Sequence, residues 1–218
     1  MNPRKLFVAG STGAVGSLLV KTAQARGIAH VPLVRPATAA RGNVPPAAAV
    51  VELSDRAALA SAMAGCSTVL QLIGTMRKRF KTGDTYETSD IGTTRQLVEA
   101  ARDAGVDHLV LLSSVGAGKP LGAYLKAKAQ AERLVVDCGI PFTILRPSAF
   151  MGAGHNVAPP FRWVAEKLRW VRYQPIRVED LVDALLEAGL RRAPLNRALE
   201  GEALWELVRA SKRNLAAP

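Results

Sequence analysis

Short, uninterrupted apolar runs alternate along the chain with longer stretches in which apolar residues recur every three or four positions. The short runs predict six strands, at residues 6–9, 29–34, 48–53, 68–73, 107–113 and 142–145. The longer stretches predict helices, the first around residues 18–23 and the others at 55–63, 87–104, 121–137 and 177–190. Strands that are apolar throughout and separated by helices are typical of a parallel sheet covered on both faces.

The order of these elements also predicts how the sheet is connected. Crossovers between parallel strands are right-handed, which places the first strand centrally and gives the strand order 3-2-1-4-5-6. No internal repeat or low-complexity linker interrupts the 218 residues. We therefore expect one doubly wound α/β domain of the Rossmann type over residues 1–218, with a small substrate-side elaboration near residues 148–178.

A glycine-rich turn joins the first predicted strand to the first predicted helix. Its sequence, from Gly10 to Gly16, is GSTGAVG, a GxxGxxG spacing in place of the commoner GxGxxG. Glycines let a ligand approach the backbone, and a helix N-terminus offers unpaired N–H groups and partial positive charge. An ordinary tight turn also contains glycines, but the position between strand and helix favours a dinucleotide phosphate site.

The end of the second predicted strand indicates which dinucleotide binds. NAD-binding sheets carry a carboxylate about 20 residues past the glycines, where it accepts hydrogen bonds from the ribose 2′-hydroxyl. This chain has Arg35 in that region, with Arg41 beyond it, and its first acidic residue is Glu52. A guanidinium pairs with phosphate oxygens, so the sequence favours NADP(H) over NAD(H), with a solvated loop arginine as the alternative.

A second group of residues suggests chemistry. Ser113 and Ser114 end the fifth predicted strand. Tyr124 and Lys128 follow in a helical stretch, four positions apart and hence on one face. A phenol is a poor acid or base at neutral pH, and a neighbouring ammonium favours its phenolate form. Because ligands bind at the carboxyl ends of parallel strands, we interpret Ser114, Tyr124 and Lys128 as catalytic, with a solvated helix face as the alternative.

Several motifs resemble those of the atypical short-chain dehydrogenases/reductases: GSTGAVG, SSVGAG, YLKAK and TILRPSAFMG. Others resemble the Tat-interacting-protein-like, or NAD-dependent epimerase/dehydratase-like, branch: IGTMRKRFKTGDTY, GVDHLVLLSSVGA and YQPIRVEDLVDALL. The resemblance covers nearly the whole chain and implies a Ser–Tyr–Lys site at Ser114 (or Ser113), Tyr124 and Lys128. It also implies cofactor contacts at Gly10, Thr12, Gly13, Ala14, Val15, Gly16, Arg35, Leu53, Ile73, Gly74, Ser113, Tyr124, Lys128 and Pro147.

The same resemblance implies what several of these residues contact. Leu53 is expected beside the adenine, Ile73 and Gly74 beside the ribose, and Pro147 near the nicotinamide. The chain departs from the family pattern at Ala129, which replaces the glycine usual after the active-site lysine. This departure removes no catalytic group.

Composition narrows the class of protein. The chain carries 29 basic and 18 acidic residues, a net charge of +11, with two cysteines and three histidines. The histidines are scattered and the cysteines lack metal-ligand spacing, so we expect no metal site and buried thiols in a reducing compartment. The charge attracts anions, but no nucleic-acid motif is present. No apolar run could span a membrane and no signal peptide is evident, which favours a cytoplasmic location.

Two basic stretches have no assigned role in this scheme. MRKRFK, at residues 76–81, follows the fourth predicted strand and is interpreted either as an anion-binding loop or as a solvated one. Residues 161–177 place aromatic residues among arginines, and as a helix they would align Phe161, Val164, Leu168 and Val171 on one face. We interpret this helix as a core-packed lid over the substrate, with contact to an anionic membrane as the alternative.

These features predict an NAD(P)H-dependent oxidoreductase or epimerase-like protein acting on a small molecule, which the basic charge suggests is anionic. In the reductive direction, Tyr124 would protonate the carbonyl oxygen and Ser114 would orient it. Lys128 would bind the nicotinamide ribose and favour the phenolate. The alternative is an NADPH-binding regulatory, sensor or assembly protein with little or no turnover.

Overall fold

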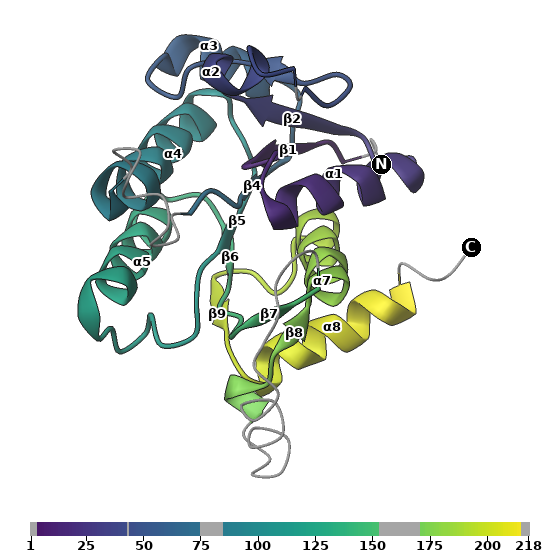
Figure 1. Ribbon diagram of the computed structural model, residues 1–218, viewed down its shortest axis with the longest axis vertical. Coiled ribbons are helices and arrows are strands. Elements are labelled where there is room, and N and C mark those ends of the chain that lie inside the picture. Colours follow the sequence, from purple (N-terminus) through teal and green to yellow (C-terminus); the bar gives the residue numbers. More distant parts are fainter. Residues whose placement is uncertain (1–3, 43, 75–84, 153–170, 215–218) are drawn as a thin grey trace.

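The computed structural model describes residues 4–42, 44–74, 85–152 and 171–214 (Figure 1). The basic stretch 76–81 lies outside these ranges, and so do residues 161–170 of the predicted lid helix. What the sequence suggests for those two segments therefore stays a prediction.

Seven parallel strands form one sheet through the middle of the molecule, in the order β3-β2-β1-β4-β5-β6-β9 (Figure 1). The strands are β1 (Leu6–Ala9), β2 (His30–Val34), β3 (Ala49–Val50), β4 (Thr68–Gln71), β5 (His108–Leu112), β6 (Phe142–Leu145) and β9 (Arg197–Leu199). The predicted order 3-2-1-4-5-6 is confirmed. β9 was not predicted, because only one of its three residues, Leu199, is buried and the run shows no apolar pattern.

Helices cover both faces of the sheet, as predicted (Figure 1). One face carries α1 (Ala14–Ala25), α7 (Val178–Arg191) and α8 (Glu202–Asn214). The other carries α3 (Arg56–Met63), α4 (Thr93–Asp103) and α5 (Gly122–Val136). Side chains of β1 alternate between the two layers, so that Leu6 and Val8 pack with α1 and α7, whereas Phe7 and Ala9 pack with α3 and α4. The strand is apolar throughout because both of its faces are buried.

The predicted helix over residues 161–177 is wrong where the structure describes it. Residues Val171–Tyr173 form a single 3₁₀ turn, η3, and Ile176–Arg177 form a strand, β8. β8 pairs in parallel with β7 (Phe150–Met151) in a separate two-stranded sheet. Pro175 lies between η3 and β8, and it ends the helical geometry because proline has no N–H to donate.

The predicted helix over residues 87–104 is confirmed in position but not in form. It begins as a π-helix, η2 (Glu87–Gly92), and continues as α4. A short turn that the sequence did not predict, α2 (Pro36–Ala39), follows β2. Both differences lie at the carboxyl ends of strands or in the connections that leave them.

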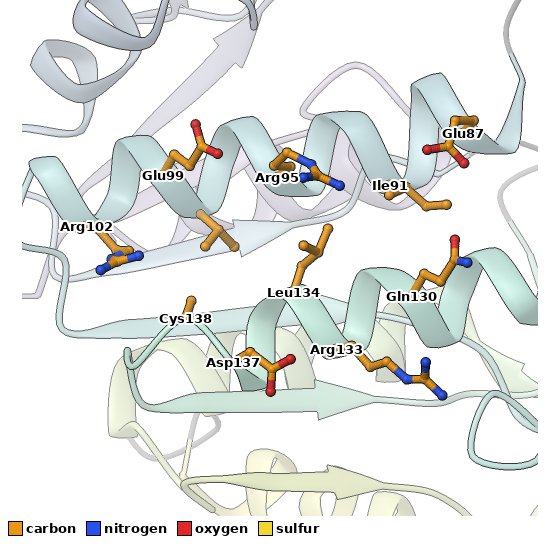
Figure 2. Close-up of a pocket in the computed structure, with 11 residues that line it drawn as sticks. Glu87, Ile91, Arg95, Glu99, Arg102, Gln130, Arg133, Leu134, Asp137 and Cys138 are labelled. Atoms are coloured by element: carbon orange, nitrogen blue, oxygen red, sulfur yellow. The ribbon is translucent and has the colours of Figure 1, made fainter.

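A hollow of about 520 Å³ lies between η2 and α4 on one side and α5 on the other (Figure 2). Its walls carry charges of both signs, among them Glu99 and Asp137 as well as Arg102 and Arg133. None of the predicted site residues lines it. The hollow is therefore separate from the carboxyl edge of the sheet, where the site is expected.

Two kinds of site are absent from the residue ranges described above. No helix there combines the length and the apolar character needed to cross a membrane. No three potential metal ligands of the histidine, cysteine, aspartate or glutamate type cluster there. Both cysteines are free and buried, and burial raises the pKa of the Cys66 thiol.

The buried histidine of β5 predicts a pH dependence of stability. His108 is fully buried with its Nε2 2.9 Å from the Thr143 hydroxyl oxygen. Burial, and then the charges of Arg192 and Arg4, lower its pKa from 6.5 to about 4. The unfolded chain therefore binds a proton that the folded chain does not, so stability is full above pH 6.5 and falls towards pH 4. We expect this group alone to cost about 2 kcal/mol between pH 7 and pH 5.

Urea unfolding of the parent and of His108→Gln at both pH values measures this effect. Other titrating groups cancel in the comparison, so the variant should lose less stability than the parent on acidification. Equal losses in the two proteins would show that His108 does not titrate across the folding transition.

Candidate functional site

The glycine turn brings the start of α1 against the end of β1. Gly10 has a φ of +90°, and the Gly13 N–H donates to its carbonyl oxygen at 3.0 Å. A side chain on Gly16 would begin 2.0 Å from that same oxygen, so only glycine fits there. The first helical bond runs from the Ser17 N–H to the Gly13 oxygen at 2.8 Å, and the N–H groups before it point out of the helix N-terminus.

This turn has the shape expected of a phosphate cradle. Backbone N–H groups face outward between Gly13 and Ser17, and Thr12 and Ala14 are exposed beside them. The side chain of Val15 packs into the core at 7% exposure, so only its backbone is available to a ligand. The residues present therefore fit a dinucleotide phosphate.

A buried hydroxyl fixes the turn relative to β2. Ser11 is 1% exposed, and its Oγ donates to the Leu33 carbonyl oxygen at 2.6 Å. Two residues further on, Arg35 is exposed at the start of α2, and within the described ranges it forms no ion pair. Arg35, which is predicted to bind the 2′-phosphate, thus lies at the end of β2, next to the glycine turn.

The end of β4 completes the same edge. A Cβ on Gly10 would lie 2.9 Å from the Leu72 carbonyl carbon, so the glycine turn touches this strand end directly. The Gln71 side chain accepts from the Ile73 N–H at 3.1 Å and thereby holds the chain that leads to Gly74. Leu53, which is predicted to lie beside the adenine, is only 8% exposed, and it packs in the core layer of α3 and α4.

Lys128 is buried where α5 passes the ends of β4 and β5. Its Nζ lies 2.8 Å from Asp90 Oδ1 and donates to the Leu112 carbonyl oxygen at 3.5 Å. The same atom is 6.0 Å from the ring centre of Tyr124, one helical turn earlier. A Cβ on Gly74 would come within 2.7 Å of Nζ, so the missing side chain there makes room for the ammonium. Lys128 is 6% exposed, whereas Tyr124 is 37% exposed.

Asp90 is a site residue that the sequence analysis missed. It is 1% exposed and lies in η2, where the Thr94 hydroxyl donates back to its carbonyl oxygen at 2.6 Å. Gln71 Nε2 in turn donates to that hydroxyl at 3.1 Å. These hydroxyl bonds compete with the regular helical ladder and accompany the π-turn. A carboxylate in register with the buried positions Leu97 and Ala101 was the available signal.

The two serines after β5 have different surroundings. Ser113 is 4% exposed, and its Oγ donates to Glu132 Oε1 at 2.5 Å. Ser114 is partly exposed, and its neighbour Val115 donates through N–H to the Pro147 carbonyl oxygen at 2.9 Å. The structure thus brings Pro147 beside the Ser114 loop and commits the Ser113 hydroxyl to Glu132 of α5.

Taken together, one edge of the sheet carries the glycine turn, a buried ammonium, a partly exposed phenol and a serine hydroxyl. Fold and edge define a dinucleotide-binding α/β domain. Residues 10–188 match the model of a family described as NAD(P)H-binding, and the chain belongs to that family. A nicotinamide cofactor is therefore the ligand class of this edge.

Two of the three sequence relatives that follow are named as reductases. A protein of Lodderomyces elongisporus named "Protein FMP52, mitochondrial" is 28% identical over 96% of this chain and 94% of its own length. A 4-hydroxy-2-methyl-3-oxo-4-farnesyl-3,4-dihydroquinoline-1-oxide ketoreductase of Stigmatella aurantiaca is 30% identical over 73% of this chain and 57% of its own. A divinyl chlorophyllide a 8-vinyl-reductase of Cucumis sativus is 23% identical over 91% and 53%. Family and relatives support an NAD(P)-dependent oxidoreductase in the broad sense.

Solved structures share the fold. A putative NAD-dependent epimerase/dehydratase from Bacillus halodurans superposes with a TM-score of 0.71 over 95% of this chain and 99% of its own, at 19% identity. MoeE5 in complex with UDP-glucose and NAD gives 0.67 over 96% and 81%, at 20% identity. These likenesses show the Rossmann-like fold.

The expected cytoplasmic location is wrong. Several fungal relatives are named as mitochondrial, and the plant relatives are named as chloroplastic. The expectation rested on the lack of a signal peptide and of a membrane span, which does not distinguish the cytosol from the interior of an organelle.

The close approach at Gly16 predicts a graded effect of added methyl groups on cofactor binding. Gly16→Ala should weaken NADPH binding by at least about tenfold, because the new Cβ displaces the turn that carries the phosphate donors. Gly13→Ala is the matched control, since its Cβ would lie 3.3 Å from the same Gly10 oxygen and needs only a slight shift. Calorimetric titration of both variants, with thermal unfolding to verify the fold, makes the comparison. Similar losses in the two variants would contradict this account of the cradle.

Proposed function

We propose that this chain is an NADP(H)-dependent reductase of the short-chain dehydrogenase/reductase type, with Tyr124 as its general acid and base. The position of Lys128 Nζ carries the proposal. This ammonium is buried at the end of β5 with Asp90 as its counter-charge, and the exposed Tyr124 ring lies 6.0 Å away. A buried, paired ammonium at the carboxyl edge of a parallel sheet supports a functional role, because ligands bind at that edge.

Each residue has a separate task in this mechanism. The bound nicotinamide supplies the hydride. The Tyr124 hydroxyl donates its proton to the substrate oxygen as negative charge develops there, and the Ser114 hydroxyl donates a hydrogen bond to the same oxygen. The Lys128 ammonium stabilises the phenolate that is left and donates to the nicotinamide ribose. Asp90 holds that ammonium in place.

The cofactor of the proposed enzyme is NADP(H) in preference to NAD(H). Arg35 supports this choice, since it is exposed at the end of β2 beside the glycine turn. The first acidic residue of the chain, Glu52, comes only after β3, so no carboxylate in this connection repels a 2′-phosphate.

A carbonyl-containing small molecule is the proposed substrate class. The name of the Stigmatella relative describes a ketoreductase, and the net charge of +11 favours an anionic compound. We also propose that the chain is one domain whose substrate side includes residues 148–178. The pairing of β7 with β8 outside the main sheet supports this assignment.

Replacing Arg35 tests the cofactor choice. Arg35→Ala should weaken NADPH binding about ten- to hundredfold, the worth of a charged hydrogen bond, and leave NADH binding unchanged. Arg133→Ala, an exposed arginine in the hollow between α4 and α5, is the control and should change neither affinity. Calorimetric titrations of the parent and the two variants with both dinucleotides give the six affinities. Equal NADPH and NADH affinities in the parent protein would refute the preference.

Replacing Tyr124 tests the mechanism. Tyr124→Phe keeps the aromatic ring and the helix, so NADPH affinity should barely change. The turnover number for a carbonyl substrate of the parent enzyme should fall by about 10²–10⁴. Lys128→Ala should lower both quantities, because the ammonium serves ribose and phenolate. It also leaves Asp90 buried without its cation, so the double variant Lys128→Met, Asp90→Asn separates loss of function from loss of stability.

These variants also distinguish the proposed enzyme from its alternative. An active parent whose Tyr124→Phe variant keeps full turnover would rule out the acid/base role. A parent that binds NADPH tightly and reduces nothing in a broad carbonyl screen would instead indicate a sensor or assembly protein. Steady-state absorbance of NADPH gives the turnover in each case.

A further inference from the structure

A chain of alternating charges leads from the end of β5 to the far side of the sheet edge. It starts at Glu132, a residue of α5 whose carboxylate accepts a hydrogen bond from the Ser113 hydroxyl. Arg146, directly after β6, pairs with this carboxylate, and Glu200, directly after β9, pairs with Arg146. Arg172 of η3 pairs with the other oxygen of Glu200. Ion pairs thus join α5, the ends of β6 and β9 and the turn η3, and a hydrogen bond adds the end of β5.

Arg146 is the centre of this chain and its best-defined member. Its Nε lies 2.9 Å from Glu132 Oε1 and its Nη2 lies 2.5 Å from Oε2, the parallel two-bond geometry of a guanidinium on a carboxylate. Its Nη1 lies 3.5 Å from Glu200 Oε2. The side chains of Arg146, Glu132 and Glu200 are 19%, 7% and 15% exposed, so solvent screens these pairs little.

The guanidinium also supports the loop between Ser114 and Tyr124. A Cβ on Gly118 would lie 2.7 Å from Arg146 Nη1, so the loop rests directly on the charged group. On the other side, the Val115 N–H is bonded to the carbonyl oxygen of Pro147, the residue after Arg146. The loop is therefore held at two points by the segment that follows β6.

Glu132 extends the face of α5 that carries Tyr124 and Lys128, at successive intervals of four residues. When Arg146 holds Glu132, it also holds this helix against the end of β5, because Glu132 is bonded to Ser113 there. One side chain, Arg146, thus contacts both the helix that carries Tyr124 and the loop that follows Ser114.

We propose that Arg146 is a positioning residue that sets the distance between the Ser114 and Tyr124 hydroxyls, by clamping Glu132 and supporting the Gly118 loop. The proposal rests on the reductase function proposed above. In this proposal the role of Arg146 is geometric, and its side chain does not take part in binding the dinucleotide.

Arg146→Lys tests this role, because lysine keeps the charge but cannot form two parallel bonds to one carboxylate. We expect kcat to fall about ten- to hundredfold, as for a small misplacement of reacting groups, with NADPH affinity unchanged. Arg56→Lys is the matched control. Arg56 makes the same two-bond pair with Asp103, at 2.5 and 2.7 Å, between α3 and α4 and away from the Ser114 loop, so kcat should not change.

Amide hydrogen exchange of residues 113–119 gives a readout that needs no turnover. Exchange should be faster in Arg146→Lys and in Glu132→Gln than in the parent, and unchanged in Arg56→Lys. If the parent reduces no carbonyl compound, the proposed function fails, and this exchange still decides whether Arg146 holds the loop.

Three results would overturn the proposal. The first is an Arg146→Lys variant with parental kcat, and the second is parental exchange over residues 113–119 in both site variants. The third is a loss of NADPH affinity as large as the loss of kcat, which would mean general damage to the site. Should Arg146→Lys fail to fold, Glu132→Gln is measured in its place, with the same expected separation of kcat from affinity.

Discussion

Only 2.0 Å separates the Gly10 carbonyl oxygen from the point at which a side chain on Gly16 would begin. This close approach lets α1 start immediately over the end of β1, and the rest of the carboxyl edge is arranged around that turn. Ser11 ties it to β2, and Gly10 itself touches the backbone at the end of β4. Because the described strands of this sheet are parallel, the loops that follow them leave the sheet at this same edge, where ligands bind in such folds.

The buried pair of Lys128 and Asp90 is the second constraint at this edge. Burying two charges costs desolvation energy that their attraction roughly offsets, so the pair adds little net stability. Losing one partner is far costlier, about 3–5 kcal/mol, because the other is then buried alone. The pair is therefore better understood as a device that fixes the ammonium in space, and the absent side chain at Gly74 provides the room it needs.

Local patterns were enough to predict β1 to β6 and their order, since these strands are apolar on both faces and the crossover rule fixes the rest. They were insufficient where tertiary contacts override local preference. β9 is defined by its pairing with β6. The π-turn of η2 is accompanied by a hydroxyl bond to one of its carbonyl oxygens. The Ser113 hydroxyl is bonded to Glu132, a residue nineteen positions away. The helix predicted over 161–177 is wrong beyond residue 170, because Pro175 ends the helical geometry that the apolar spacing alone favours.

The contrast in exposure between Tyr124 and Lys128 supports the proposed catalytic role over the alternative of cofactor storage. A protein that only holds a dinucleotide needs the glycine turn and an ammonium for the ribose. It gains nothing from a phenol that stays 37% exposed, with its ring tilted by 55° against the Tyr86 ring at 5.7 Å and 6.0 Å from the Lys128 ammonium. A group that acts as an acid must meet its substrate, whereas a charge that acts on it interacts more strongly when it is sheltered from water. This chain keeps the phenol accessible and buries the cation one helical turn away.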